Sequence, residues 1–88
     1  MTVVEQEFVV QLEQGLHARP AARFVQTAAR FTSEITVTAG GVSVSAKGIM
    51  GVLRLGVRQG MSLHLRAEGA DAPRAVEALG RLLSGADE

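Results

Sequence analysis

Four stretches of the chain alternate between hydrophobic and polar residues, and this period of two is typical of strands that bury one face. Two of the stretches are separated only by Gly40 and Gly41. A diglycine pair between alternating segments predicts a β-hairpin, because both central residues of a type I′ turn need a positive φ. The four expected strands cover residues 4–12, 34–39, 42–46 and 61–68.

Three other stretches favour helices. From Ala21 to about Arg30 the apolar residues recur every three or four positions, as in an amphipathic helix. Pro20 places the start of this helix within a residue or two, because proline suits the first helical turn. A last helix with an apolar stripe follows Asp71, a good N-cap residue. Residues 49–55 are short and mostly apolar, and we interpret them as a short helix.

The expected order is strand, helix, strand, strand, helix, strand, helix. Because every strand alternates, one face of the sheet should be exposed to water. A four-stranded, mainly antiparallel sheet with three helices on one face, related to split βαβ designs, satisfies this pattern with two layers. The chain has 88 residues, of which 47% are hydrophobic, and this supplies one small core. We therefore expect a single α+β domain over residues 1–88.

Composition argues against several classes of protein. The chain has no cysteine, so packing must hold it together in place of a disulfide framework or a thiolate metal site. No apolar run approaches the roughly 20 residues that span a bilayer, and the N-terminus lacks the pattern of a signal peptide, so we expect a cytoplasmic protein without membrane insertion. Nine acidic and nine basic residues balance, and only three residues are aromatic, which disfavours nucleic-acid binding.

The candidate chemistry lies where the first expected strand gives way to the first helix. A helix start presents unpaired backbone N–H groups and a partial positive charge, which attract phosphate groups. His17 stands at this start, and the guanidinium of Arg19 is a planar donor fork suited to phosphate oxygens. A neutral imidazole can attack phosphorus. Each residue alone could be an ordinary surface side chain, but their shared position favours an anion site.

Residues 15–22 (Gly-Leu-His-Ala-Arg-Pro-Ala-Ala), 31–35 and 45–52 closely resemble HPr, the histidine-containing phosphocarrier of the bacterial phosphoenolpyruvate:sugar phosphotransferase system. The resemblance extends over essentially the whole chain. It implies the open-faced β-sandwich of that family (βαββαβα), a monomer, and neither a cofactor nor a metal.

The resemblance also implies a phosphoryl relay. Enzyme I, charged by phosphoenolpyruvate, phosphorylates the family's histidine on Nδ1, and HPr passes the group to enzyme IIA components for sugar uptake. Such a protein is a carrier between partner enzymes and not itself an enzyme. His17 corresponds to this histidine and Arg19 to the phosphate-stabilising arginine, while the C-terminal carboxylate that approaches the arginine would be Glu88. The alternative is an HPr-like regulatory module in which the state of His17 controls other proteins.

In the family, the short helix beside the histidine forms an apolar docking surface for enzyme I and enzyme IIA. The matching residues are Ile49 and Met50, and methionine suits a surface that must fit several partners. Leu53 could belong to the same surface, although a core position is equally consistent with it and with Val52. The expected partner contacts are Ala18, Arg23, Lys47, Ile49, Met50 and Leu53, with Arg23 and Lys47 as a basic rim that could also serve solubility alone.

The sequence departs from the family at Gly48, where many members carry a regulatory serine. Glycine offers no hydroxyl to a serine kinase, so regulation by phosphoserine is put in doubt. Partner-facing lysines of the first helix are also missing, with Gln26 and Ala29 on that side. His64 should lie on the wet sheet face without a carboxylate or second histidine at metal-ligand spacing, and we assign it no role. A βαββαβ nucleic-acid or ligand module would need a basic or aromatic sheet face, which these outward positions lack.

Overall fold

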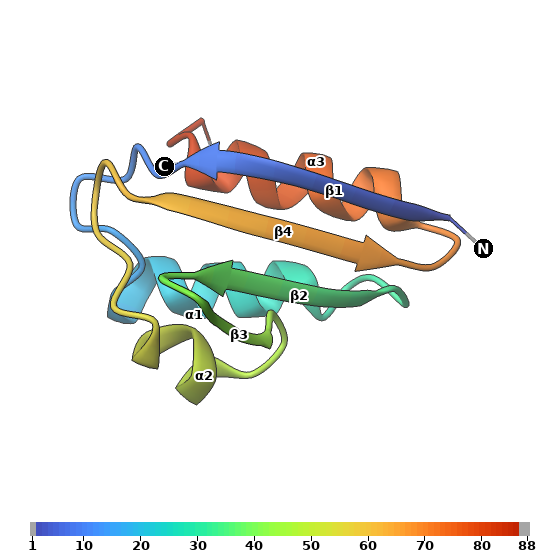
Figure 1. Ribbon diagram of the computed structural model, residues 1–88, viewed down its shortest axis with the longest axis horizontal. Coiled ribbons are helices and arrows are strands. Elements are labelled where there is room, and N and C mark those ends of the chain that lie inside the picture. Colours follow the sequence, from blue (N-terminus) through green and yellow to red (C-terminus); the bar gives the residue numbers. More distant parts are fainter. Residues whose placement is uncertain (1, 87–88) are drawn as a thin grey trace.

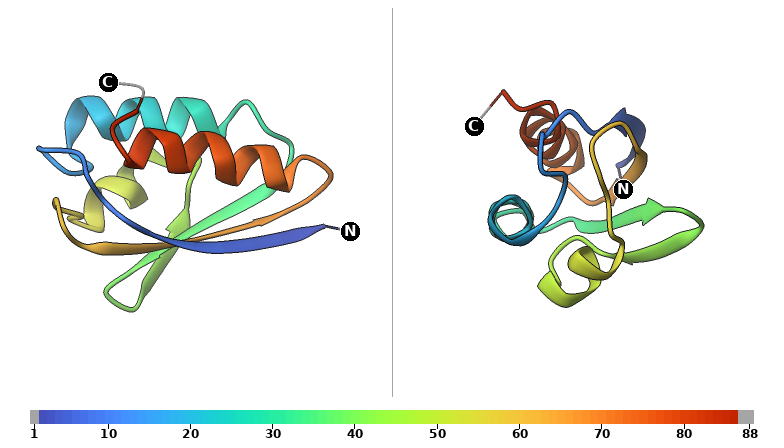
Figure 2. Two further views of the ribbon diagram at one scale, coloured as in Figure 1. Left: turned by 90° about the horizontal axis from the view of Figure 1, so that it is seen from above. Right: turned by 90° about the vertical axis from the view of Figure 1, so that its left-hand side faces the viewer.

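The computed structural model describes residues 2–86, and its elements follow the expected order (Figure 1). The strands pair into one antiparallel sheet in the order β1-β4-β2-β3. The helices cover one face of this sheet and leave the other uncovered (Figure 2). The expected α+β open-faced sandwich is therefore confirmed. The elements are β1 (Val3–Val9), α1 (Ala18–Ala28), β2 (Glu34–Ala39), β3 (Val42–Ser45), α2 (Ile49–Arg54), β4 (Ser62–Glu68) and α3 (Ala72–Leu83).

The core lies between the sheet and the helices. The inward side chains of the central strand β4 are fully buried; they are Leu63, Leu65 and Ala67. On the helix side of the core, α1 contributes the buried Phe24. The apolar stripe predicted for α3 is confirmed, because its members pack into the same core. They are Ala75, Val76, Leu79, Leu82 and Leu83.

The predicted hairpin between β2 and β3 is confirmed. Gly40 and Gly41 have φ angles of 57° and 80°, as a type I′ turn requires. Ala39 of β2 pairs with Val42 of β3 directly across the turn. The short β3 forms one edge of the sheet, and β1 forms the other.

The first strand and the first helix differ most from the predicted bounds, and the later strands and α2 lie within one residue of theirs. The first strand ends at Val9 and not at Leu12. Val10 still bonds to Met61 and Gly60 before β4, but the next N–H, that of Gln11, bonds to the carbonyl of Leu83 at the end of α3. The first helix begins at Ala18 and ends at Ala28, so Pro20 is its third residue. Proline is tolerated there because none of the first-turn N–H groups has an intrahelical acceptor. Ala29, which the predicted helix included, lies after the helix end and is exposed.

Asp71 occupies the N-cap position of α3, but its side chain makes no capping hydrogen bond. Its carboxylate instead accepts hydrogen bonds from Thr32 and Ser33 in the loop before β2. The prediction of a capping aspartate was therefore correct in position and wrong in bonding. Within residues 2–86, no helix is long and apolar enough to cross a membrane.

Candidate functional site

The loop that leads to His17 is held by backbone hydrogen bonds to two neighbouring segments. The N–H of Gln11 donates to the carbonyl of Leu83 at 2.9 Å, and the N–H of Leu16 donates to the carbonyl of Val57 at 3.0 Å. The side chain of Leu16 is buried in the core. The residue immediately before His17 is thus fixed by both its backbone and its side chain.

Gly15 permits this close approach. Its φ is +67°, and a Cβ added there would lie 2.3 Å from the carbonyl oxygen of Val57. Any other residue would have to displace the Val57 backbone and adopt a left-handed conformation that side chains disfavour. Gly15 is therefore needed to seat the loop against residue 57 and to aim the chain into α1.

His17 is the N-cap residue of α1. Its backbone is extended, with φ −102° and ψ −174°, and its carbonyl accepts the first helical hydrogen bond from Ala21 at 2.8 Å. The side chain is exposed and makes no hydrogen bond within residues 2–86. Because the N–H groups of Ala18 and Arg19 precede the first helical donor, they stay available at the same helix end. The imidazole thus stands beside unpaired donors at the positive end of the helix dipole.

Arg19 lies beside His17 on the same open surface. The two side chains line a shallow depression of about 430 Å³ together with Gln14, Ala18 and Pro20. The guanidinium is exposed and has no hydrogen bond or ion pair within residues 2–86. The structure therefore brings the two predicted phosphate-handling groups together. Glu88, expected to approach Arg19, lies outside the described residues.

The charged residues around this site are mostly basic. Between Glu13 and Glu68 the only acidic residue is Glu34. The helix α1, the loop after it, α2 and the two loops beside α2 therefore carry basic residues alone, and Glu13 is the acidic residue in the loop before α1. These residues are Arg19, Arg23, Arg30, Lys47, Arg54 and Arg58. Arg23 lies one turn after Arg19 on α1, and it is exposed as expected. The face formed by α1 and α2 is therefore mainly positive, with Glu13 in the loop before His17 as the exception, although the formal net charge of the chain is zero.

The short helix α2 packs against α1 and β3 (Figure 1). Its outer side presents an apolar surface to solvent. Ile49, Met50 and Leu53 are 37%, 64% and 38% exposed, and we call these three residues the α2 patch. Val52 points the other way and is fully buried. The sequence did not decide whether Val52 and Leu53 lie in the core or on the surface. In the structure, Val52 belongs to the core and Leu53 belongs to the surface.

Lys47 is bound at the opposite end of α1 from His17. Its Nζ donates a hydrogen bond of 2.7 Å to the carbonyl of Phe31, beyond the far end of α1. The C-terminal end of α2 leads to Val57. The carbonyl of Val57 accepts a hydrogen bond from the N–H of Leu16, so this end of α2 lies near His17. The exposed cation on this nearer end is Arg54, in the last turn of α2. Arg54 was not among the expected partner contacts, although the lack of acidic residues between Glu34 and Glu68 is visible in the sequence.

Gly48 is the N-cap residue of α2, and a side chain at this position would enter open space. The nearest atom to an added Cβ is the carbonyl oxygen of Ser45, at 3.9 Å. The φ of −111° and ψ of 113° are accessible to all residues. Nothing in the fold therefore requires glycine at this position.

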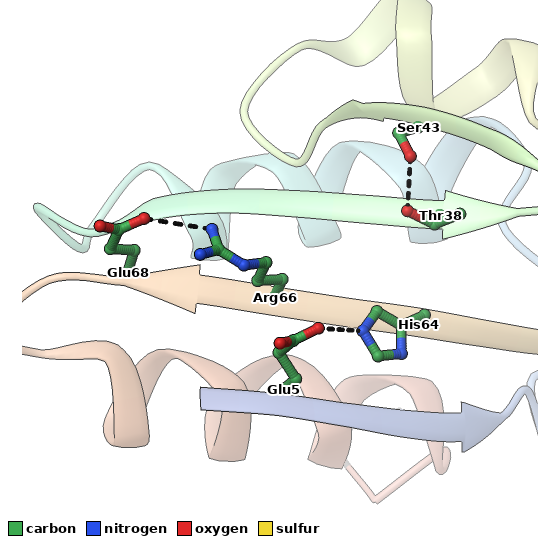
Figure 3. Close-up of polar contacts among 6 residues, drawn as sticks. All are labelled: Glu5, Thr38, Ser43, His64, Arg66 and Glu68. Atoms are coloured by element: carbon green, nitrogen blue, oxygen red, sulfur yellow. Dashed lines mark hydrogen bonds and ion pairs between the residues drawn. The ribbon is translucent and has the colours of Figure 1, made fainter. Parts of the chain in front are cut away.

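His64 lies on the uncovered face of the sheet, as predicted, but it has a carboxylate partner. Its Nε2 is 2.8 Å from Oε1 of Glu5 on the neighbouring strand β1 (Figure 3). Pairing of β1 with β4 brings these two residues together although they are 59 positions apart in the sequence. Within residues 2–86, no group of three or more His, Cys, Asp or Glu side chains could hold a metal ion.

Comparison with known proteins places these features in a family. The PTS-HPr family model, described as the PTS HPr component phosphorylation site, matches residues 4–85. HPr-like protein Crh of Halalkalibacterium halodurans is 49% identical over 77 residues, which are 88% of this chain and 92% of that protein.

Solved structures give the same relationship. The phosphocarrier protein HPr of Bacillus anthracis superposes with a TM-score of 0.91 at 41% identity, over 94% of this chain and 99% of that one. Crh of Bacillus subtilis superposes with a TM-score of 0.75 at 44% identity, over 93% and 94% of the two chains. That Crh crystal structure is an intertwined dimer with a swapped domain, which does not fit the expectation of a monomer.

The family model covers nearly the whole chain, a relative is 49% identical over 77 residues, and the fold that surrounds His17 is the fold of solved HPr proteins. This protein therefore belongs to the HPr family of phosphocarrier proteins of the phosphotransferase system.

Proposed function

We propose that this protein carries phosphoryl groups in a bacterial phosphoenolpyruvate:sugar phosphotransferase system, and that it works in the cytoplasm. His17 accepts the group on Nδ1 from phospho-enzyme I and passes it to an enzyme IIA component. The observation that carries this proposal is the exposed, unpaired imidazole at the open start of α1, in one depression with Arg19. Membership of the HPr family supports the same role.

The chemistry follows from this geometry. The Nδ1 lone pair of neutral His17 attacks the phosphorus, and the bond from phosphorus to the donor's leaving atom breaks in line with the new N–P bond. Negative charge on the phosphoryl oxygens is stabilised by the guanidinium of Arg19 and by the first N–H groups of α1. Transfer to enzyme IIA reverses the roles, with Nδ1 as the leaving atom. His17 is held in place for both steps by the backbone hydrogen bond at Leu16.

Partner enzymes dock on the α2 patch and on the positive face around it. Apolar contact with Ile49, Met50 and Leu53 supplies affinity, while the basic residues select partners with acidic surfaces. Ala18 and Arg23 extend this surface along α1, and Lys47 extends it at the far end. Arg54 adds a contact that lies nearer to His17.

A second candidate function is regulation. It is favoured by the 49% identity to a protein named HPr-like protein Crh, and the Bacillus subtilis Crh is named for catabolite repression. In this alternative, the phosphorylation state of His17 controls binding to a regulatory or metabolic protein. Gly48 removes the serine through which some HPr proteins are regulated, so His17 would be the switch.

The test combines the protein with enzyme I and phosphoenolpyruvate and records the phosphorus NMR signal of Nδ1-phosphohistidine. We expect the signal in the wild type and its loss in His17→Ala. His64→Ala is the matched control, because these are the two histidines of the chain. A signal that persists in His17→Ala would overturn the assignment.

Adding enzyme IIA separates the two candidate functions. A carrier hands its label to enzyme IIA within the mixing time, and the phosphohistidine signal of the carrier falls. Stable phosphorylation of His17 without onward transfer favours the regulatory function. Size-exclusion chromatography of both forms determines whether the protein is a monomer or a dimer as in the Crh crystal structure.

A further inference from the structure

Met50 presents an accessible sulfur atom on the α2 patch. The residue is 64% exposed, more than either of its neighbours in the patch, Ile49 and Leu53. The chain contains no cysteine, so redox chemistry at a thiol is not open to it. Exposure and chemistry together therefore direct an oxidant to the thioether of Met50.

Met61 provides an internal contrast. Its side chain is half-buried against the core, and its Sδ accepts a hydrogen bond of 3.2 Å from the N–H of Arg58. The sulfur is thus shielded by packing, and one lone pair is engaged. The two sulfur atoms differ in access although both belong to methionine.

We propose that Met50 is a site of reversible oxidation by peroxides, and that its sulfoxide weakens docking of the phosphotransfer partners. In the step, the sulfur attacks a peroxide oxygen, an S–O bond forms, the O–O bond breaks, and water or an alcohol leaves. The sulfur gives up two electrons and the peroxide gains them. Methionine sulfoxide reductases reverse the change. This inference rests on the proposed function, because it assigns the α2 patch to docking.

The consequence for docking follows from the surroundings of Met50. A sulfoxide places a strongly polar oxygen beside Ile49 and Leu53, whose side chains offer no hydrogen-bond donor. Docking would remove water from that oxygen without replacing its hydrogen bonds, and this desolvation is unfavourable. An interface anchored by few apolar side chains is sensitive to such a change, and we expect transfer at low protein concentration to fall ~10-fold.

The first experiment maps the oxidation. The full-length protein is exposed to limiting hydrogen peroxide, digested with trypsin and analysed by mass spectrometry. Cleavage after Lys47 and Arg54 isolates Met50 in the peptide 48–54, and cleavage after Arg58 and Arg66 isolates Met61 in the peptide 59–66. We expect peptide 48–54 to gain one oxygen atom well before peptide 59–66. Equal rates for the two peptides would overturn the assignment of Met50.

The second experiment measures the initial rate of phosphoryl transfer from enzyme I, with and without peroxide treatment of the carrier alone. The wild type and Met61→Leu should both slow ~10-fold after treatment, and a sulfoxide reductase should restore the rate. Met50→Leu, which keeps the volume but lacks the sulfur, should give the same rate before and after treatment. An unchanged rate for wild type with oxidised Met50 would overturn the inference. Failure of the untreated protein to accept phosphate would instead contradict the proposed function.

Discussion

The carboxylate of Asp71 accepts hydrogen bonds from both the backbone N–H and the hydroxyl of Ser33, 38 positions earlier in the chain. A further bond of 2.9 Å comes from the N–H of Thr32. Ser33 is 1% exposed, so its polar groups depend on this partner. The contact ties the loop before β2 to the start of α3, on the opposite side of the molecule from the loop that carries His17 (Figure 1).

The first prediction concerns stability in acid. The Ser33 hydroxyl and then the Thr32 N–H lower the pKa of Asp71 from 3.8 to about 2. Because the folded pKa lies below the unfolded one, the stabilisation is complete above about pH 4 and is lost as the pH falls towards 2. We expect Asp71→Asn to lower the free energy of unfolding at neutral pH. We also expect the free energy of unfolding of this variant to fall less than that of the wild type between about pH 4 and pH 2. Denaturant titrations across pH measure both effects.

Glu13→Gln is the control for this prediction, because Glu13 lies in an exposed loop before α1. It should keep the pH dependence of the wild type. Asp71→Asn with an unaltered acid decline would mean that other carboxylates govern stability below about pH 4.

A second prediction concerns the contact between Gly80 of α3 and the ring of Phe8 on β1. A Cβ added to Gly80 would lie 2.5 Å from Cε1 of Phe8 and 2.6 Å from Cζ. Alanine is intrinsically the better helix residue by about 1 kcal/mol. We nevertheless expect Gly80→Ala to destabilise the protein by about 1 to 2 kcal/mol net, because the ring must leave its place against the helix. Urea unfolding measures the difference.

The same change in a Phe8→Leu background is the control for overpacking. The shorter side chain frees the space that the added methyl group needs, so Gly80→Ala should cost less there. Equal losses in both backgrounds would show that the ring is not the cause.

A third prediction concerns the position of the missing regulatory serine. The site around Gly48 has room for a Cβ, and serine is a slightly better N-cap than glycine. Gly48→Ser should therefore fold normally, with a stability within a few tenths of a kcal/mol of the wild type. We expect the variant, and not the wild type, to be phosphorylated by an HPr serine kinase and ATP. Mass spectrometry of the peptide 48–54 locates the phosphate. Labelling of the wild type under the same conditions would contradict the loss of this regulation.

A fourth prediction concerns the fork geometry of Arg19. Lysine keeps the positive charge but cannot bind two phosphoryl oxygens in a planar fork. Arg19→Lys should lower kcat/KM for transfer from enzyme I by about tenfold, with an unchanged circular dichroism spectrum. Arg30→Lys, beyond the far end of α1, is the matched control and should transfer at the rate of the wild type. Equal losses in the two variants would reduce the role of Arg19 to general surface charge.

The sequence alone determined the elements and the candidate chemistry. Alternation and helical spacing are local properties, so the strands, helices and diglycine turn could be predicted from neighbouring residues. The histidine and arginine at the start of α1 were found for the same reason, since they stand two positions apart in one motif.

The tertiary structure decided what depends on residues far apart in sequence. Only the pairing of β1 with β4 gives His64 its contact with Glu5. Only packing of α2 on α1 and β3 shows that Leu53 is exposed while Val52 is buried, and that Lys47 is bound to Phe31. A periodic pattern reports which face of an element is apolar, but it does not report which distant segment covers that face.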